Sequence, residues 1–401
     1  MKKIISKKVQ DLAPSGIRKF FDLVLGMEDV ISLGVGEPDF VTPWKIRESA
    51  IYSLEQGYTS YTSNKGLYKL RLYIGRHLKR KYGLDYDPDN EILITVGVSE
   101  GLDLAARSII NPGDEIIIPQ PSYVSYGPVV SLAGGVPIYI DTRKSGFKLR
   151  PADLDKKCNK KTKGILINYP SNPTGISYTK KELKGLSEVI LKHNLLVICD
   201  EVYDDLTYDF HHTPFATLGQ NIKERVIYLN GFSKGYAMTG FRVGFVCGQK
   251  EVVSAMTKIH QYTMLCAPIT SQMAACEALH GGAKSVEEMK KEYHRRRDYV
   301  LERLSEIGLE CIKPQGAFYV FPCVKKTGLS SIEFANKLLK KKRVAVVPGT
   351  AFGEDYGDFI RISYASSLDN LKQAFERIES FVHLRPPKFA KMIGESAKHC
   401  G

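Results

Sequence analysis

The stretch RVIYLNGFSKGYAMTGFRVGFVCG, residues 225–248, places a glycine-rich loop between two apolar, β-branched runs. Such runs are typical of strands, and the loop between them holds Ser233, Lys234 and Arg242. Glycine lets a backbone turn tightly and approach a ligand closely. The stretch therefore predicts two strands joined by a loop that presents a serine, a lysine and an arginine to a phosphate or a carbonyl group.

The chain before this stretch alternates between short apolar runs and helical patterns with turn signals. The runs are EILITVG (91–97), DEIIIPQ (114–120), VPIYID (136–141), GILINYP (164–170) and LLVICDE (195–201). Strands that alternate with helices predict a mostly parallel sheet with helices on both faces. We therefore expect an α/β fold built around this sheet.

The chain after the stretch follows a different pattern. Residues 285–308 are amphipathic at helical spacing and end at a glycine, which predicts a long helix. Apolar runs at 309–324, 344–353 and 358–365 then predict strands separated by a helical segment. This pattern predicts a smaller α+β unit in this part of the chain.

The length of 401 residues exceeds the size at which one hydrophobic core stops growing. We expect a large domain at 46–290 and a small domain that both chain ends form, at 1–45 and 291–383. Residues 384–401 contain no clear periodicity and are expected to be a C-terminal extension.

The net charge of +13 raises the question of nucleic-acid binding. The basic residues are spread in short runs, without an aromatic-interleaved stripe, a helix-turn-helix or a zinc-finger pattern. We interpret the charge as solvated helix faces that also attract small anions, and expect no nucleic-acid partner. No apolar stretch has the length of a membrane span and the N-terminus has no signal-peptide pattern, so we expect no membrane partner.

The eight cysteines form no CxxC pair, and several lie inside apolar runs. This pattern favours buried free thiols in a reducing compartment over a disulfide framework or a zinc site. We expect a cytoplasmic protein without a bound metal.

Polar residues follow the predicted strands, where ligands bind in open α/β sheets. Ser99 and Glu100 fall in the opening turn of a helix, where free N–H groups and the helix dipole favour an anion; a plain helix cap would have the same sequence. Asp200 ends a strongly apolar strand, so its carboxylate needs a cationic partner. A structural salt bridge or a protonated heterocyclic nitrogen would both meet that need.

Tyr123, Asn172 and Tyr203 also follow strands, although each alone is typical of an ordinary turn, core or surface residue. One ligand accounts for all of these groups. Pyridoxal 5′-phosphate has an aldehyde for Lys234, a pyridine nitrogen for Asp200 and a phosphate for the loop and the helix turn. Its phenolic oxygen suits Asn172 and Tyr203, and its flat ring suits Tyr123. A flavin or a nicotinamide would not require the lysine, and no GxGxxG stands between a strand and a helix.

Several motifs occur along the chain in a characteristic order. They are SLGVGEPDF (32–40), YTSNKG (61–66), YPSNPTG (169–175), CDEVYDDL (199–206), GFSKGYAMTGFRVGF (231–245) and FIRISYA (359–365). In combination they resemble the class I/II pyridoxal-phosphate aminotransferases of fold type I. The resemblance is greatest to the branch with aspartate, aromatic and N-acetyl-diaminopimelate aminotransferases, and it runs from about residue 10 to residue 382.

The resemblance implies a role for each matching residue. Lys234 would form the Schiff base with the cofactor, Asp200 would pair with the pyridinium nitrogen, and Tyr203 would act at the phenolic oxygen. The other implied cofactor contacts are Ser99, Glu100, Tyr123, Asn172, Ser233 and Arg242. Tyr61 resembles a tyrosine that reaches the phosphate across a dimer interface. The implied substrate contacts are Gly36, Asn172 and Arg361, of which Arg361 would grip the α-carboxylate.

The resemblance also implies an activity and an assembly. The enzyme would move the amino group of an L-amino acid to 2-oxoglutarate by a ping-pong mechanism through a pyridoxamine phosphate form, as a homodimer. Aspartate, aromatic and longer acidic amino acids stay open as donors. Ile17, beside Ser15 and Gly16, suits an apolar side chain, whereas Arg18 suits an acidic one. KIHQYTMLCAPIT, residues 258–270, offers no arginine for a side-chain carboxylate.

Two alternatives share the implied scaffold. A β-lyase acting on cysteine conjugates or cystathionine would use the same residues, and none of them excludes it. A transcription regulator with an aminotransferase-like domain would carry a DNA-binding module first, but the aminotransferase pattern begins near residue 10. We therefore expect an aminotransferase, with the β-lyase as the alternative.

Overall fold

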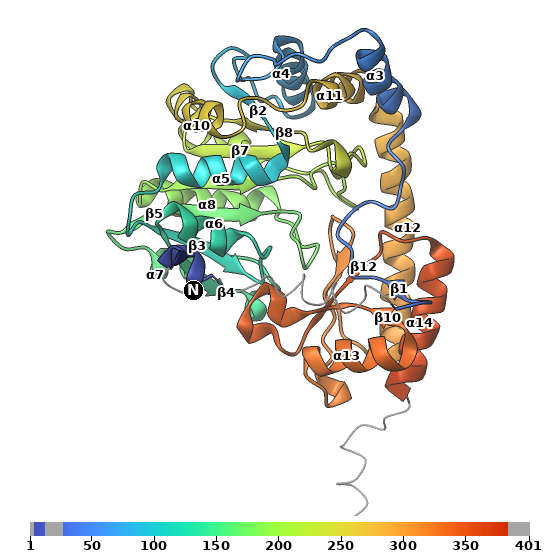
Figure 1. The fold of residues 1–401 in the computed structure, drawn as a ribbon. Coiled ribbons are helices and arrows are strands. Elements are labelled where there is room, and N and C mark those ends of the chain that lie inside the picture. Colours follow the sequence, from blue (N-terminus) through green and yellow to red (C-terminus); the bar gives the residue numbers. More distant parts are fainter. Residues whose placement is uncertain (1–3, 13–26, 384–401) are drawn as a thin grey trace, which may run out of the picture.

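A seven-stranded sheet forms the centre of the larger part of the molecule (Figure 1). The computed structural model describes residues 4–12 and 27–383. The strands follow the order β2-β8-β7-β6-β5-β3-β4. Their bounds are β2 (Ile92–Thr95), β3 (Glu115–Gln120), β4 (Val136–Asp141), β5 (Thr162–Asn168), β6 (Leu196–Asp200), β7 (Val226–Gly231) and β8 (Gly244–Cys247). Strand β8 is antiparallel to β2 and β7, and the remaining pairs are parallel, so the predicted mostly parallel sheet is confirmed.

Helices cover both faces of this sheet. On one face lie α5 (Gly97–Ile109), α6 (Tyr126–Ala133) and α10 (Lys250–Thr263), and on the other α4 (Tyr68–Tyr82) and α8 (Lys180–Lys192). Successive side chains of a strand point to opposite faces. In β5, accordingly, Ile165 and Ile167 join the core under α8, whereas Leu166 joins the core under α5. Burial on both faces explains why these strands are continuous apolar runs.

The C-terminal part of the chain forms a second, smaller arrangement. A three-stranded antiparallel sheet has the order β11-β12-β9, with bounds β9 (Tyr319–Val320), β11 (Val347–Pro348) and β12 (Ile360–Ser363). Helices α13 (Ser331–Lys342) and α14 (Leu368–His383) pack beside it. A segment from the start of the chain joins here, because β1 (Ile31–Ser32) pairs in parallel with β10 (Val344–Ala345). The segment around β1 therefore belongs to this part, whereas α1 (Lys7–Gln10) lies against α6 of the larger part, where Lys8 donates to the carbonyl of Leu132.

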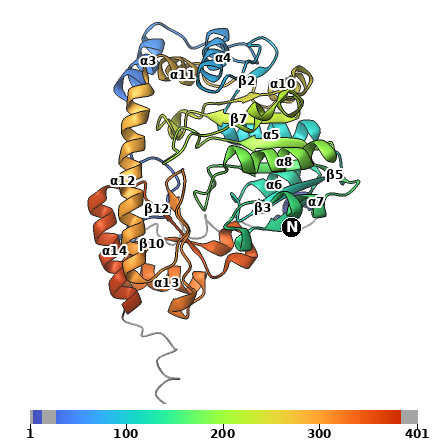
Figure 2. The ribbon, with the colours of Figure 1, turned by 180° about the vertical axis from the view of Figure 1, so that it is seen from behind.

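The long helix α12 (Ala283–Ile307) extends from the larger part, beside α3 (Trp44–Glu55) and α11 (Ile269–Gly281), to the smaller part, beside α14, as Figures 1 and 2 show from opposite sides. It ends at Gly308, whose φ of +79° caps the helix. Two buried arginines in its middle bind other segments: Arg296 reaches Asp39 at 2.9 Å, and Arg297 reaches Asp209 at 3.0 Å. The helix crosses the expected boundary at residue 290 without a break, and the domain boundaries stay a prediction.

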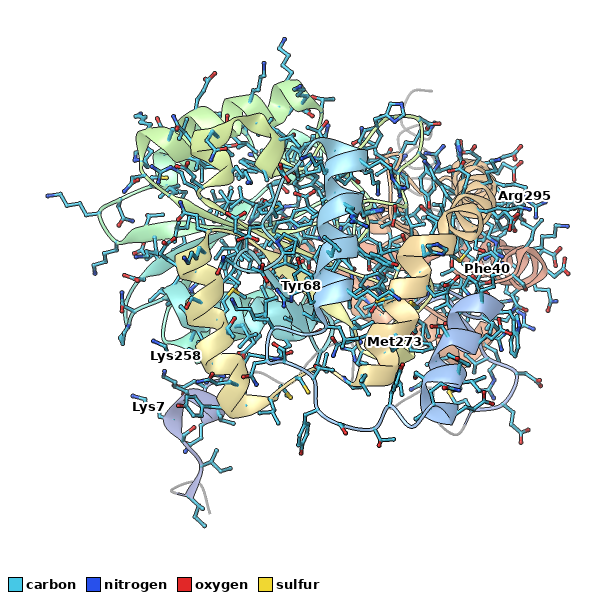
Figure 3. The ribbon with its side chains drawn as sticks, turned by 90° about the horizontal axis from the view of Figure 1, so that it is seen from above. Lys7, Phe40, Tyr68, Lys258, Met273 and Arg295 are labelled. Atoms are coloured by element: carbon cyan, nitrogen blue, oxygen red, sulfur yellow. The ribbon has the colours of Figure 1, made fainter. Side chains whose placement is uncertain are left out.

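Helices α3 and α11 lie side by side at the end of the sheet that β2 occupies (Figures 1 and 3). The Ser49 hydroxyl donates to the carbonyl of Met273 at 3.2 Å. Short helices among residues 4–12 and 27–383 also include α1 (Lys7–Gln10), α7 (Pro151–Lys157) and α9 (Gln220–Lys223). In the described part of the chain, no helix is both long enough and apolar enough to cross a membrane.

Candidate active site

A cavity of about 1560 Å³ opens at the carboxyl ends of the parallel strands, where ligands bind in sheets of this kind. Ten of the twelve residues singled out in the sequence line it. They are Gly36, Ser99, Tyr123, Asn172, Asp200, Tyr203, Ser233, Lys234, Arg242 and Arg361. The other two, Glu100 and Tyr61, are not among the lining residues.

Asp200 is the last residue of β6, and its buried carboxylate faces the cavity. The Tyr126 hydroxyl donates to Oδ2 at 2.8 Å, and the Val202 N–H donates to Oδ1 at 3.2 Å. Burial raises the pKa of Asp200 to about 6, although these hydrogen bonds pull it down. A cation beside the carboxylate would stabilise its charged form, so the site suits a positively charged ring atom.

Lys234 lies in the loop that follows β7, and its amine extends into the cavity. Its Nζ atom donates to the carbonyl oxygen of Gly36 at 2.6 Å. Burial lowers the pKa of Lys234 to about 8, and the positive charge of Arg361 contributes to this shift. An amine with this pKa is neutral in about one molecule in ten at pH 7, far more often than an ordinary lysine, and the neutral form is the one that a nucleophile or a proton acceptor requires.

An anion cradle forms where the start of α5 meets the glycine-rich loop. Ser99 lies in the first turn of α5, whose N–H groups have no partners within the helix. Gly97, at the start of that turn, has a φ of +73°, and a Cβ there would come within 2.8 Å of the Arg242 guanidinium. Ser233 and Arg242 line the same cavity. The close approach of α5 to Arg242 therefore depends on glycine at position 97.

The Glu100 side chain does not take part in this cradle. Its Oε2 atom accepts from the Val96 N–H at 2.5 Å, and its Oε1 atom lies 2.6 Å from Nδ1 of the buried His260. The sequence placed Glu100 in the correct helix turn, but these two partners hold its carboxylate away from the cavity. Any contribution of Glu100 to anion binding comes from its backbone.

Arg361 lies on β12, with only 2% of the residue exposed. One terminal nitrogen donates to Oδ1 of Asn172 at 2.9 Å, and the other donates to the carbonyl of Gly34 at 2.5 Å. The guanidinium also lies over the rings of Tyr319 and Phe352, with centroid distances of 4.5 Å and 5.0 Å. Its buried Nε atom has no hydrogen-bond partner among the described residues. The group is thus fixed in place with donor capacity that a carboxylate would use.

Three residues of the site were not singled out in the sequence analysis. Tyr126 donates to Asp200, and Tyr319 lies with its hydroxyl 3.0 Å from that of Tyr203. Asn168, at the end of β5, donates to the backbone carbonyl of Asp200 at 2.8 Å and accepts from the Asn172 N–H at 2.9 Å. A tyrosine or an asparagine near the end of a strand is ordinary in sequence. The end of the apolar run GILINYP was the one available hint, and it pointed to Asn168.

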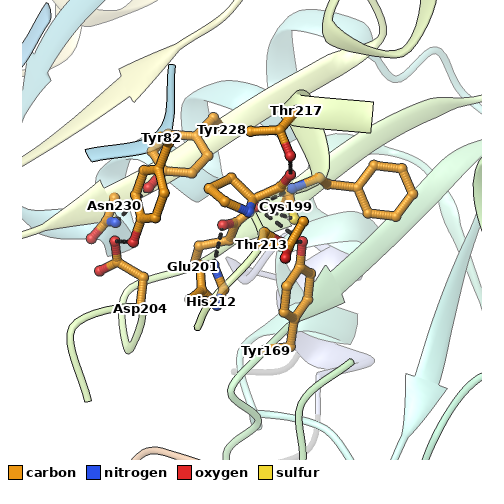
Figure 4. A network of polar contacts seen from close by, with 12 residues as sticks. Tyr82, Tyr169, Cys199, Glu201, Asp204, His212, Thr213, Thr217, Tyr228 and Asn230 are labelled. Carbon is orange, nitrogen blue, oxygen red and sulfur yellow. Dashed lines mark hydrogen bonds and ion pairs between the residues drawn. The ribbon is translucent and has the colours of Figure 1, made fainter. Parts of the chain in front are cut away.

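A buried polar network supports the turn that carries Asp200 and Tyr203 (Figure 4). Glu201, which is fully buried, accepts from the Phe215 N–H at 3.0 Å and lies 2.5 Å from Nε2 of His212. The Tyr169 hydroxyl donates to the same carboxylate at 3.3 Å. Glu201 does not line the cavity, so the network supports the turn without contacting a ligand in the cavity.

Tyr61 lies on the surface, with 82% of the residue exposed. Its neighbourhood contains many exposed apolar side chains, which come from residues 44–68 and 262–265. They are Trp44, Ile51, Tyr52, Leu54, Tyr58, Tyr61, Tyr68, Tyr262, Met264 and Leu265. The two segments meet where the Asn64 side chain donates to the carbonyl of Leu265 at 2.8 Å. Ser15, Gly16, Ile17 and Arg18, considered for the substrate pocket, lie outside the described residues, as does the expected extension at 384–401.

These residues fit pyridoxal 5′-phosphate. The buried Asp200 carboxylate suits a protonated ring nitrogen, and the Lys234 amine, with its lowered pKa, suits an aldehyde. Ser99, Ser233 and Arg242 line the cavity beside the first turn of α5, and this set of donors suits a phosphate. Arg361, on β12, lines the same cavity and offers its guanidinium to a second anion.

Comparisons with known proteins agree with this geometry. The pattern of the family "Aminotransferase class I and II" matches residues 28–378. A putative aminotransferase of Bacillus subtilis, YugH, is 52% identical over 384 residues, which are 96% of this chain and 99% of that protein. An aspartate aminotransferase of Pyrococcus abyssi is 44% identical and matches over 94% of this chain and 97% of its own. The solved structure of an aromatic aminotransferase from Pyrococcus horikoshii is 42% identical, covers 92% of this chain and 98% of its own, and superposes with a TM-score of 0.87.

Proposed function

Since the chain belongs to the class I and II aminotransferases, which depend on pyridoxal phosphate, we propose that it moves the amino group of an aspartate-type or aromatic L-amino acid to 2-oxoglutarate in a ping-pong cycle. The enzyme acts on amino acids and oxo acids, as its family does. The observation that carries the proposal is the meeting of Lys234, Asp200 and Arg361 in one cavity. These are the nucleophile, the charge partner and the carboxylate grip that transamination requires.

Each residue proposed to bind the cofactor faces a particular part of it. Lys234 would bind the aldehyde carbon, and Asp200 the ring nitrogen. Ser99, Ser233, Arg242 and the first turn of α5 would hold the phosphate, with Tyr123 against the ring and Asn172 and Tyr203 at the phenolic oxygen. When bound, the cofactor supplies an electron sink for the bonds at the substrate Cα.

Lys234 is proposed to move the substrate proton. Its Nζ atom has a pKa lowered to about 8, so it takes up and releases a proton near neutral pH. The carbonyl of Gly36, 2.6 Å away, holds the amine in the cavity. Lys234 can therefore accept the Cα proton and deliver it elsewhere in the same site.

Arg361 and Asn172 are proposed to orient the substrate. A planar guanidinium binds a carboxylate through two parallel hydrogen bonds, which an ammonium group does not. Asn172 holds the guanidinium through a 2.9 Å hydrogen bond, and Gly36 lets the backbone approach closely. A fixed α-carboxylate fixes the direction of the Cα–H bond, which decides the bond that breaks.

The relatives support the substrate range, because those with similar sequences include both aspartate and aromatic aminotransferases. We further propose a homodimer, which the exposed apolar segments 44–68 and 262–265 support, since large exposed patches mark interaction sites. We place the enzyme in the cytoplasm. Seven described cysteines are free thiols, which suits a reducing compartment.

Absorbance titration of the purified, cofactor-loaded protein with single amino acids, without any oxo acid, tests the proposal. Aspartate, glutamate or an aromatic amino acid should convert the cofactor band to that of the amino form, and 2-oxoglutarate should restore the original band. A cysteine-conjugate β-lyase would leave the band unchanged with these amino acids and would release pyruvate and ammonia from cysteine conjugates. That second result would overturn the proposed function.

A further inference from the structure

Tyr319 is a fully buried residue of the cavity wall that no step above uses. It lies on β9, which pairs with β12 so that Tyr319 is opposite Ser363, two residues after Arg361. Tyr203, by contrast, follows β6 of the large sheet. The position of Tyr319 thus places a phenol between the residue proposed for the cofactor's phenolic oxygen and the residue proposed for the substrate carboxylate.

Tyr319 makes a different contact with each neighbour. Its hydroxyl lies 3.0 Å from that of Tyr203. Its ring lies under the Arg361 guanidinium, 4.5 Å from the ring centroid, which is the geometry of a cation–π interaction. A Cβ on Gly36 would come within 2.7 Å of the Tyr319 hydroxyl, so the backbone at Gly36, which also lines the cavity, packs closely against this atom.

We propose that Tyr319 is a positioning residue that acts on both sides of the site: its hydroxyl donates to Tyr203 and its ring supports Arg361. The proposal rests on the proposed function, which assigns Tyr203 to the cofactor. A phenol has one proton and two lone pairs. When Tyr203 donates its proton to the cofactor oxygen, its own oxygen is free to accept the Tyr319 proton. Hydrogen bonds in such a chain strengthen one another in a buried site.

The charged and ionisable groups that face Tyr319 come from several elements. They are Arg361, Tyr203, Tyr123 and Glu37. In the described hydrogen bonds, the Tyr203 hydroxyl is paired with Tyr319, and none of Arg361, Tyr123 and Glu37 donates to it. Loss of the Tyr319 hydroxyl should therefore weaken the donation from Tyr203, leave more negative charge on the cofactor oxygen, and strengthen the hold of that oxygen on a neighbouring proton.

The first test compares Tyr319→Phe and Tyr203→Phe by pH titration of the absorption band of the bound cofactor, without substrate. Both substitutions should move the midpoint of the titration upward, Tyr319→Phe by about 0.5 to 1 pH unit for the loss of one buried hydrogen bond. In a Tyr203→Phe background, Tyr319→Phe should add no further shift, since its effect passes through Tyr203.

The second test separates the ring from the hydroxyl. Tyr319→Leu removes the surface under Arg361, so KM for the amino acid should rise about tenfold above the value in Tyr319→Phe. Tyr364→Phe is the matched control, because Tyr364 is also fully buried but donates to the Ala317 carbonyl and does not line the cavity. It should leave both the titration midpoint and KM unchanged.

The outcomes separate this inference from the proposed function. An unchanged midpoint in Tyr319→Phe, beside a shifted midpoint in Tyr203→Phe, would overturn the role of Tyr319 alone. That role would also be overturned if Tyr319→Phe shifted the midpoint equally in the presence and absence of the Tyr203 hydroxyl. An unchanged midpoint in Tyr203→Phe would overturn the assignment of Tyr203 and the inference with it, whereas transamination measured with amino acids would still decide the proposed function.

Discussion

Lys234 is the residue on which turnover should depend most. Its amine is the one lysine amine of the described residues that lines the cavity, and it bonds to Gly36 there. Lys234→Ala should abolish multiple turnovers, while the fold survives because the removed side chain leads into a cavity rather than a packed core. Activity assays and circular dichroism check both parts. Lys258→Ala, at an exposed site on α10, should keep full activity; multiple turnovers in Lys234→Ala would refute the assignment.

The planar guanidinium of Arg361 should be necessary for substrate binding. Arg361→Lys keeps the charge but loses the fork that reaches Asn172 and Gly34. We expect kcat/KM to fall more than about tenfold, which corresponds to about 1.4 kcal/mol or more. Steady-state kinetics with the preferred amino acid measure the change. An unchanged kcat/KM would remove Arg361 from the carboxylate grip.

Asp200 should make the cofactor-free protein less stable at neutral pH. Burial raises the pKa of this carboxyl from 3.8 to about 6. Between these values the folded chain holds a proton that the unfolded chain has lost, so stability falls as pH rises through this window. Two pKa units correspond to a cost of up to about 3 kcal/mol for the charged form.

Asp200→Asn removes this titration. In denaturant unfolding of the cofactor-free proteins, the variant should exceed wild type in stability at pH 8, and the difference should shrink as pH falls toward 4. A difference that stays constant with pH would show that Asp200 titrates at its ordinary pKa in the folded protein.

At the scale of elements, a single added methyl group at the start of α5 should weaken cofactor binding. Gly97→Ala would place a Cβ against the Arg242 guanidinium, in a backbone conformation with φ of +73°. We expect the dissociation constant of pyridoxal 5′-phosphate to rise about tenfold or more, for a loss of about 1.4 kcal/mol. Gly113→Ala is the matched control, because Gly113 has a similar φ of +89° and an open space around its Cβ position. It should lower stability without changing cofactor affinity; equal affinities for both variants would contradict the role of the α5 turn.

The elements differ in how far the sequence predicts them. Strands β5, β6 and β7 are predictable, because burial on both faces makes them continuous apolar runs. The two-residue strand β1 is not, since its pairing with β10, Ile31 with Val344, depends on segments far apart in the chain, although the apolar run 344–353 that contains β10 is recognisable in the sequence. The same difference holds in the site. A charged residue at the end of an apolar strand, such as Asp200, can be found in the sequence, whereas the contacts of Tyr126 and Tyr319 exist only in the folded molecule.

For the whole molecule, the exposed apolar segments 44–68 and 262–265 predict association. Analytical ultracentrifugation should give twice the chain mass of 44.9 kDa. Leu54→Glu, on α3 within these segments, should shift the protein toward monomer, since it would bury a charge at the interface. Leu191→Glu, on α8 at a similarly exposed position, should leave the mass unchanged. A wild-type monomer at micromolar concentration would contradict the homodimer and leave Tyr61 without a site to complete.

The pairing of β1 with β10, and of Gly34 with Arg361, joins opposite ends of the chain. Synthesis releases the N-terminal end first, so β1 leaves the ribosome long before its partners exist. A nascent chain that has grown as far as α12 already carries every residue proposed to hold the cofactor, from Ser99 to Arg242. It still lacks the arginine proposed to hold the substrate. The order of translation therefore completes the cofactor side of the cavity first and the substrate side last.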